Sequence, residues 1–171
     1  WSTCAQNSDA SLCLSGDPFL SDSGECEWGG VSCEDGLVTE LVFEKNNLGG
    51  FLPPELSALT SLKVISLERG SISGRIPSSI GLLSNLEILD LDYNAISGPI
   101  PAEISRLSRL KLLDLNDNDL TGSLDALSGL TSIQFLQIHA NKIGGTVPAA
   151  FGALNKLMAL TLQPHHKSSA Q

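Results

Sequence analysis

The sequence is poor in several features that would each point to a class of function. Of its 171 residues only 10 are Lys or Arg, against 19 Asp or Glu, which gives a formal net charge of −9. This balance argues against a nucleic-acid ligand, because neutralising phosphates needs a basic face. No apolar run approaches the roughly 20 residues that span a bilayer. We therefore expect membrane attachment only through a segment outside this sequence, and the first residue, Trp1, suggests a mature or trimmed chain.

Motifs of common metal sites and hydrolases are also missing. There is no Cys-x-x-Cys pair, and the three histidines (His139, His165 and His166) lie far from the cysteines, which argues against structural zinc. The sequence contains no Asp-x-Asp-x-Asp-Gly loop for calcium and no Gly-x-Ser-x-Gly element for a hydrolase. We predict that the protein is not an enzyme and that it holds no metal and no cofactor.

All four cysteines lie within the first 33 residues, at Cys4, Cys13, Cys26 and Cys33. An even number in one short segment predicts two disulfides and an oxidising environment outside the cytosol. Three pairings are possible. The local one, Cys4–Cys13 with Cys26–Cys33, is favoured because short loops close most easily.

From residue 38 onward the sequence repeats itself, with a period of 24 residues and one interval of 23. The pattern is LxxLxLxxNxLxGxIPxxLxxLxx, and its copies start at Val38, Leu62, Leu86, Leu110, Ile133 and Leu157. A fixed period of this length predicts a solenoid. Because one repeat cannot bury its own apolar face, stacked repeats share a core and the ends of the stack must be covered.

Each position of the repeat has a structural interpretation. The LxL element alternates with period two and predicts a short strand with one face inward. An Asn follows it in most repeats, where its amide can bond backbone groups that lack partners, at Asn46, Asn94, Asn118 and Asn141. The second repeat has Gly70 there instead, which should interrupt this ladder. The fourth repeat is one residue short and has Leu124-Asp125 in place of Ile-Pro, which predicts a different turn.

The chain therefore divides into three segments. Residues 1–37 form a disulfide-stapled, acidic N-terminal cap, in which Trp28 of CEWGGVSC supplies apolar area against the first repeat. Residues 38–162 form five repeats and a partial sixth, and residues 163–171 form a polar tail that we expect to be disordered.

The motifs resemble the plant-type (plant and algal) extracellular leucine-rich repeat family. The family's LxGxIP element and its C-x-W-x-G-V-x-C cap are both present, and the resemblance covers about residues 26–162. Residues 1–25 look more like caps of diatom-type repeat proteins. The resemblance implies an α/β-type, right-handed solenoid with a parallel sheet on the concave face and 3-10 or irregular turns on the convex side. It also implies the ectodomain of a cell-surface receptor or co-receptor. A secreted inhibitor of a cell-wall-degrading enzyme and a structural wall or matrix protein are the alternatives.

Strand alternation also predicts the residues that face outward from the concave sheet. An apolar row is expected at Val64, Ile88, Leu112 and Phe135, beside an acidic patch at Asp90, Asp92 and Asp114. This combination suits a peptide or protein partner that presents apolar side chains with Lys or Arg, and a larger receptor is a further expected partner. The predicted site comprises Val64, Ile88, Leu112, Phe135, Asp90, Asp92, Tyr93, Asp114, Asn116 and His139.

Three other interpretations of this face were weighed against a binding groove. The aspartates can be solvated consensus positions of the repeat. Asp90, Asp92 and Asp114 could instead bind calcium through oxygens on adjacent strands. A hydrolase built on His139 with Asp92 and Asp114 is disfavoured, because an open strand face excludes no water.

Overall fold

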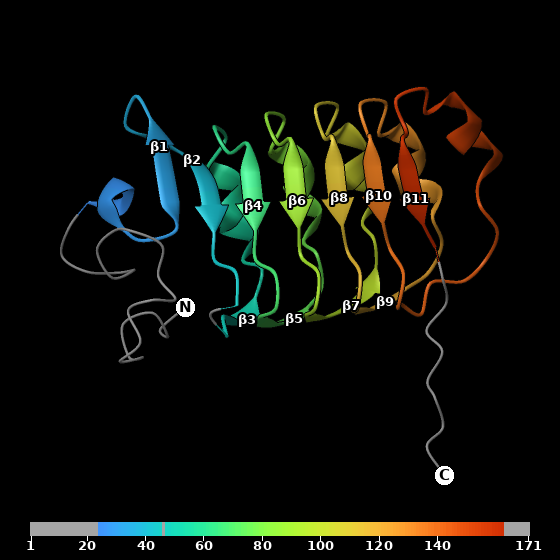
Figure 1. The fold of residues 1–171 in the computed structure, drawn as a ribbon, viewed down its shortest axis with the longest axis horizontal. Helices are drawn as coiled ribbons and strands as arrows, with labels where there is room; N and C mark the ends of the chain where they lie inside the picture. The colour runs from blue at the N-terminus through green and yellow to red at the C-terminus, as the bar shows by residue number, and fades with distance from the viewer. Residues whose placement is uncertain (1–23, 46, 163–171) are drawn as a thin grey trace, which may run out of the picture.

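The structure, a computed structural model, describes residues 24–45 and 47–162. Its strands lie side by side in chain order from the N-terminal to the C-terminal end, and short helices cover the side behind them (Figure 1). This arrangement confirms the predicted solenoid. Within the described part of the chain, no helix has both the length and the hydrophobicity needed to cross a bilayer. The expected Cys4–Cys13 disulfide and the tail at 163–171 lie outside the described residues.

A seven-stranded sheet forms the concave side, and each repeat adds one strand to it. The first pair of strands is antiparallel and all later pairs are parallel. The strands coincide with the LxL elements, because alternation there places one face against the core. They are β1 (Val31–Glu34), β2 (Leu37–Val42), β4 (Val64–Ser66), β6 (Ile88–Asp90), β8 (Leu112–Asp114), β10 (Phe135–Gln137) and β11 (Ala159–Thr161).

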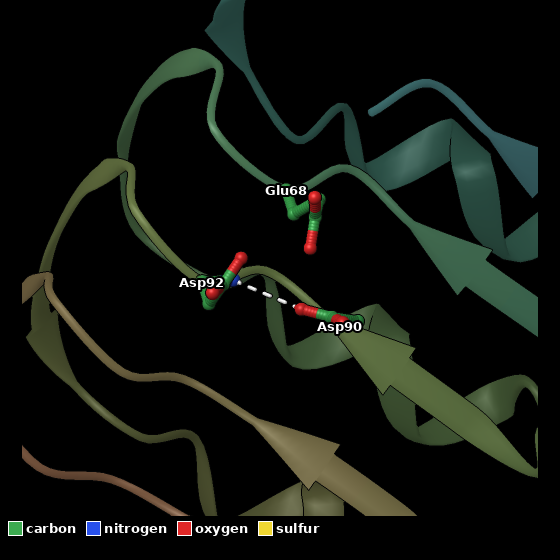
Figure 2. A group of neighbouring side chains, drawn as sticks. All are labelled: Glu68, Asp90 and Asp92. Atoms are coloured by element: carbon green, nitrogen blue, oxygen red, sulfur yellow. Dashed lines mark hydrogen bonds between the residues drawn. The ribbon is translucent and has the colours of Figure 1, made fainter. Parts of the chain in front are cut away.

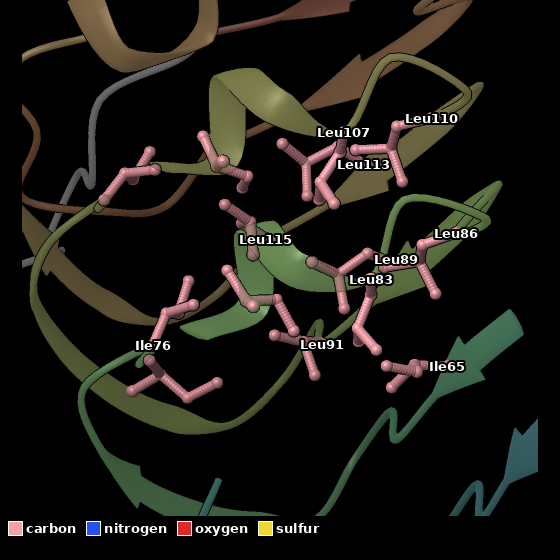
Figure 3. Packing of buried hydrophobic residues seen from close by; sticks show 14 of the residues in the cluster. Ile65, Ile76, Leu83, Leu86, Leu89, Leu91, Leu107, Leu110, Leu113 and Leu115 are labelled. Atoms are coloured by element: carbon pink, nitrogen blue, oxygen red, sulfur yellow. The ribbon is translucent and has the colours of Figure 1, made fainter. Parts of the chain in front are cut away.

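The apolar positions of every repeat meet in one continuous core. Leu89 and Leu91 of the third repeat and Leu113 and Leu115 of the fourth are all 0% exposed. Leucines from the helical side of the repeat, such as Leu107, pack against them (Figure 3). Because burying one such side chain contributes roughly 2 kcal/mol, neighbouring repeats stabilise one another mainly through these contacts.

Short 3-10 helices form the side opposite the sheet, as expected. Four of them follow a proline in extended backbone, for example Pro77 with φ −70° and ψ 144°, because the ring fixes φ close to this value. The shortened fourth repeat differs, since Leu124 precedes its helix with φ −87° and ψ 1°, which confirms the predicted change of turn. The helices are η3 (Pro54–Ala58), η4 (Ser78–Leu82), η5 (Ala102–Arg106), η6 (Asp125–Gly129) and η7 (Ala149–Ala153), with η2 (Glu25–Glu27) in the cap.

A second parallel sheet runs along the edge of the solenoid where the chain leaves the concave strands (Figure 1). The sequence predicted the concave sheet and the 3-10 turns of the convex side, but it did not predict this second sheet. The segments are too short for their alternation to be recognised in the sequence, and they become a sheet only because stacked repeats align them. The strands are β3 (Gly49–Phe51), β5 (Ser71–Gly74), β7 (Ala95–Pro99) and β9 (Asp119–Thr121).

The asparagines form the predicted ladder between repeats. The Asn118 side chain donates to the carbonyl oxygens of Leu91 (2.9 Å), Leu115 (3.3 Å) and Asn116 (3.0 Å), and its Oδ1 accepts from the Ile96 N–H at 2.9 Å. Each such amide joins its own repeat to the preceding one. Asn94 and Asn141 make the same set of contacts, and Asn46 lies outside the described residues.

Gly70 occupies the asparagine position of the second repeat and supplies no side chain to the ladder. A Cβ atom there would lie 2.8 Å from the Leu48 carbonyl oxygen and 2.9 Å from Asn94 Oδ1. The backbone of the first repeat and the amide of the third therefore approach too closely for any larger residue.

The N-terminal cap is a β-hairpin that continues the concave sheet. Strands β1 and β2 pair antiparallel around Asp35 and Gly36, whose φ values of 51° and 74° suit a tight hairpin turn. The predicted disulfide between Cys26 and Cys33 is present and ties η2 to β1. Trp28 packs against the core, as predicted, so the hairpin covers the end of the first repeat.

Candidate functional site

The outward positions of the concave sheet align in rows, as strand alternation predicts. Parallel pairing places Val64 beside Ile88, Ile88 beside Leu112, and Leu112 beside Phe135. We call these four residues the apolar row. Two positions further along the strands, Asp90 lies beside Asp114 in the same register. The sheet therefore brings together side chains that are about 24 residues apart in the chain.

The apolar row is only partly accessible. Val64, Ile88 and Leu112 are half-buried, because neighbours in the row cover one another, whereas Phe135 is 38% exposed. Phe135 is thus the most prominent apolar side chain of the row.

An acidic cluster lies beside the row, where the second and third repeats leave their strands. It consists of Glu68, Asp90 and Asp92, whose carboxylate oxygens lie within 4.8 Å of one another (Figure 2). Asp90 is fixed by a bond from the Asp92 N–H to its Oδ1 at 3.2 Å. The sequence predicted Asp90 and Asp92 but not Glu68, which precedes them by one repeat and joins them only through stacking.

The carboxyl groups of this face hold their protons more tightly than ordinary aspartates. Burial raises the pKa of Asp92 to about 7, and the charges of Asp90 and Asp114 add to the effect. Burial also raises the pKa of Asp90 to about 6, although the hydrogen bond from the Asp92 N–H acts in the opposite direction. The pKa of Asp114 is raised for the same reason, burial. The face therefore changes charge near neutral pH.

Two positive side chains lie near the cluster, and one of them pairs with Glu68, a member of the cluster. Lys45 Nζ, which comes from the first repeat, lies 3.7 Å from Glu68 Oε1. Arg69 stacks over the Tyr93 ring at 5.0 Å from its centroid. Asp92 Oδ1 is buried and accepts no hydrogen bond in the structure. The cluster thus carries a charge that its surroundings compensate only in part.

The remaining predicted site residues take different roles. Tyr93 is 48% exposed, and its positive φ of 49° projects it from the turn after the strand. Asn116 was expected to face outward, but it is only 4% exposed because its Oδ1 accepts from the His139 N–H at 2.9 Å. Asp114 is likewise 8% exposed, and its Oδ1 accepts from the Asn116 N–H at 3.0 Å. Asp114 and Asn116 therefore contribute little accessible area to the concave face.

The observed contacts bear on the two chemical alternatives, a calcium site and a hydrolase. Glu68, Asp90 and Asp92 can each offer a carboxylate oxygen to a metal ion, and calcium would need further oxygens from the backbone or from water to reach its six to eight ligands. His139 Nε2 lies 3.6 Å from Asp117 Oδ2, whereas the hydrolase hypothesis would place it against Asp92 or Asp114.

Comparison with known proteins identifies the repeat. The leucine rich repeat family matches residues 60–120 and 84–143. The ectodomain of the receptor kinase SOBIR1 from Arabidopsis thaliana is 32% identical over 81% of this chain and 80% of its own length, with a TM-score of 0.75. The chain belongs to the plant-type leucine-rich repeat family. This leucine-rich repeat ectodomain is a non-catalytic module.

Two further relatives show what such ectodomains bind. A chain from the BIR3–SERK2 complex of Arabidopsis thaliana is 30% identical to this chain. The match covers 95% of this chain and 92% of that one, with a TM-score of 0.73. The plant peptide hormone receptor RGFR1, solved in complex with RGF2, is 33% identical over 70% of this chain and 19% of its own, with a TM-score of 0.66. Homologous ectodomains thus bind peptide hormones and SERK co-receptors.

The curated relatives of the leucine-rich repeat ectodomain are much longer proteins. Two receptor-like kinases of Arabidopsis thaliana match over 29% and 25% of this chain, and the matched segments make up only 5% and 6% of their lengths.

Proposed function

We propose that this chain is the recognition ectodomain of a cell-surface receptor or co-receptor, and that it binds a peptide or protein through the concave sheet. The observation that carries the proposal is the apolar row aligned beside the acidic cluster on a rigid parallel sheet. Exposed apolar area on such a scaffold favours a partner, and the flanking charge selects and orients it.

The setting of the protein supports an extracellular role. The Cys26–Cys33 disulfide persists in oxidising compartments, and the relatives are cell-surface receptor ectodomains. Ectodomains of similar length form protein complexes, as the BIR3–SERK2 structure does. A larger receptor is therefore a partner to expect here, beside a peptide that presents apolar and basic side chains.

The proposal is tested by capture of partners from the extracellular fraction of the source organism. The variant carries Ile88→Ser, Leu112→Ser and Phe135→Ser on the apolar row. A matched control carries Phe51→Ser, Leu82→Ser and Val147→Ser, three exposed apolar residues outside the concave strands. Thermal unfolding must first show that both variants fold.

We expect wild type and control to capture the same partners and the apolar-row variant to lose at least about nine-tenths of them, since hot-spot contacts dominate such interfaces. Equal capture by all three proteins would remove the concave face as the binding site. Inhibition of a polygalacturonase panel, lost in the apolar-row variant, would reassign the protein as a secreted enzyme inhibitor.

A further inference from the structure

The C-terminal end of the stack exposes residues that occupy core positions of the repeat. In the third repeat these positions are Leu86, Leu89, Leu91, Ile96 and Ile100, none of them more than 5% exposed. At the C-terminal end the equivalent side chains are half-buried or exposed, and Val147 is 50% exposed. We call these residues the open end, and they are Ile143, Val147, Leu157, Leu160 and Leu162. Apolar area that stacking buries elsewhere therefore meets solvent here.

The same end presents an unpaired strand edge. β11 is the outermost strand of the concave sheet, and in the part of the chain that the structure describes it pairs with β10 alone (Figure 1). The Ala159 N–H donates to the Gln134 carbonyl oxygen at 3.1 Å, and the Thr161 carbonyl oxygen accepts from β10's neighbour Ile138 at 3.0 Å. Because backbone groups alternate in direction along a strand, the N–H and carbonyl of Leu160 face the opposite side.

Two further features set the open end apart from the joints between inner repeats. The Leu120 N–H of the fourth repeat donates to Asn141 Oδ1 of the fifth at 3.0 Å, whereas no asparagine within 157–162 stands ready to accept from the Ile143 N–H. A cavity of about 150 Å³ lies at this end, lined in part by Ile143, Val147 and Leu162. The open end is therefore hollow as well as apolar.

The charge distribution indicates which surface can meet the open end. No acidic residue follows Asp125 in the sequence, whereas residues 1–37 hold seven acids and neither Lys nor Arg. The net charge of −9 is thus concentrated away from the open end. Two copies that meet through their open ends place their acidic caps as far apart as possible, which minimises the repulsion between two negatively charged chains.

A two-fold contact would satisfy the strand edge as well as the apolar area. In an antiparallel pair of β11 strands, Leu160 lies opposite Leu160 of the second copy, and a pair of this kind exchanges two N–H···O bonds. The exposed Lys156 lies on the N-terminal side of β11, so antiparallel pairing places the two lysines at opposite ends of the contact. A head-to-tail contact is disfavoured, because the cap hairpin already covers the core at the other end.

We propose that the open end is a self-association surface, through which two copies of this chain form a symmetric dimer whose concave sheet continues from one β11 into the other. Such an isologous contact needs one surface that is complementary to itself. The open end meets this condition through its free strand edge, its apolar area and its lack of acidic charge. The apolar row takes no part in the contact, so the proposal is independent of the proposed function and leaves both concave faces accessible.

Sedimentation velocity of the full chain between about 1 and about 100 µM tests the proposal, since the mass should rise towards that of a dimer with concentration. The variant carries Val147→Glu and Met158→Glu, whose wild-type side chains are 50% and 74% exposed at this end. The control carries Phe51→Glu and Leu82→Glu, which are 62% and 56% exposed on β3 and η4. We expect the dimer dissociation constant to rise at least about tenfold in the variant and to stay unchanged in the control, because like charges would meet across the contact.

A second variant tests the strand edge itself. Leu160→Pro removes the N–H that faces the open side and leaves the bonds of Ala159 and Thr161 to the preceding repeat in place. It should likewise raise the dissociation constant at least about tenfold, because a proline on an edge strand prevents further pairing. In wild type, exchange of the Leu160 N–H with solvent should slow at least about tenfold from the lowest to the highest concentration. Thermal unfolding must first show that the variants fold.

Several outcomes would overturn the proposal. They are a chain that stays monomeric at about 100 µM, a dimer that survives both open-end variants, and a dimer that the control weakens equally. A dimer that forms only after residues 163–171 are removed would show that these residues cover the open end in the intact chain. Capture of another extracellular protein by a monomeric chain, lost with Val147→Glu and Met158→Glu, would assign the open end to that protein.

The apolar-row variant separates this proposal from the proposed function. It should form dimers as wild type does while losing its captured partners. Loss of the dimer in that variant would place self-association on the concave sheet and overturn the present proposal. Retention of both dimer and partners would overturn the proposed function alone.

Discussion

The two faces of the concave sheet are built from alternate residues of the same short strands, yet they differ in almost every respect. On the inner face, the second to fifth repeats each present a pair of buried aliphatic residues, such as Leu113 and Leu115. On the outer face, the equivalent positions change from repeat to repeat, from Ser66 to Asp90 to Gln137. The inward residues must fill the shared core, which limits them to apolar side chains, whereas the outward residues do not pack in the core and can differ between repeats. The residues that determine the fold therefore lie on one face, and the residues that we propose for recognition lie on the other.

The largest expected difference compares two neighbouring leucines on β8. Leu113→Ala should lower the free energy of unfolding by about 3 kcal/mol, because it opens a cavity in the fully buried core. Leu112→Ala on the outer face should cost less than about 1 kcal/mol. Urea denaturation of the two variants measures both values. Similar losses would show that the outer leucine is part of the core, which would break the comparison.

The next largest effect concerns two asparagines of the fourth repeat. Asn118→Ala should cost about 2 to 3 kcal/mol, because it leaves the Ile96 N–H without its acceptor and removes one of the two asparagine donors to each of the Leu91 and Leu115 carbonyl oxygens. Asn116→Ala removes mainly the bond to the His139 N–H and should cost about 1 kcal/mol. Thermal and urea unfolding of both variants would test this. An equal cost would place Asn116, although it belongs to an outer row, among the structural residues.

The smallest expected effect is a gain in stability on the outer face. Asp92 has a pKa of about 7 when folded and near 3.8 when unfolded, so between these values only the folded protein holds the proton. The free energy of unfolding therefore falls as pH rises from about 4 to about 7. Asp92→Asn should remove the part of this dependence that Asp92 contributes, leaving the parts due to Asp90 and Asp114, and should be more stable than wild type by about 1 kcal/mol at pH 7.5, after allowance for solvent screening.

The control for this prediction is Asp35→Asn, which should leave stability nearly unchanged at every pH because the side chain is exposed. Unfolding curves between about pH 4 and about pH 8 give the comparison. If Asp92→Asn were less stable than wild type above pH 7, the carboxylate would be compensated in the free protein.

The sequence predicted the inner face well because its signals are local and repeated. The alternation at Leu89 and Leu91, the asparagine after it and the proline before four of the helices recur with the repeat, and each has one physical role. The second sheet was not predicted, because three-residue strands such as β3 gain their pairing only from neighbouring repeats. A period identifies the element that repeats, but not every contact that stacking creates.

The outer face was predicted less completely, for a related reason. The rows were correct, since register follows from the period, and Ile88, Leu112 and Phe135 do align. The burial of Asn116 and the approach of Glu68 to Asp90 and Asp92 depend on side-chain positions across strands, which the sequence does not encode locally. The role of each predicted residue in binding stays a prediction.

The glycine at position 70 has a consequence for how the molecule comes apart. In the described residues, asparagine amides connect the second repeat to the third, the third to the fourth and the fourth to the fifth, while the joint between the first and second repeats has Gly70. A stack of this kind behaves as a row of units coupled only to their neighbours, so it opens at its weakest joint. The cap with its disulfide stands next to that joint. The cap therefore stabilises the end of the stack at which the repeats would otherwise separate first.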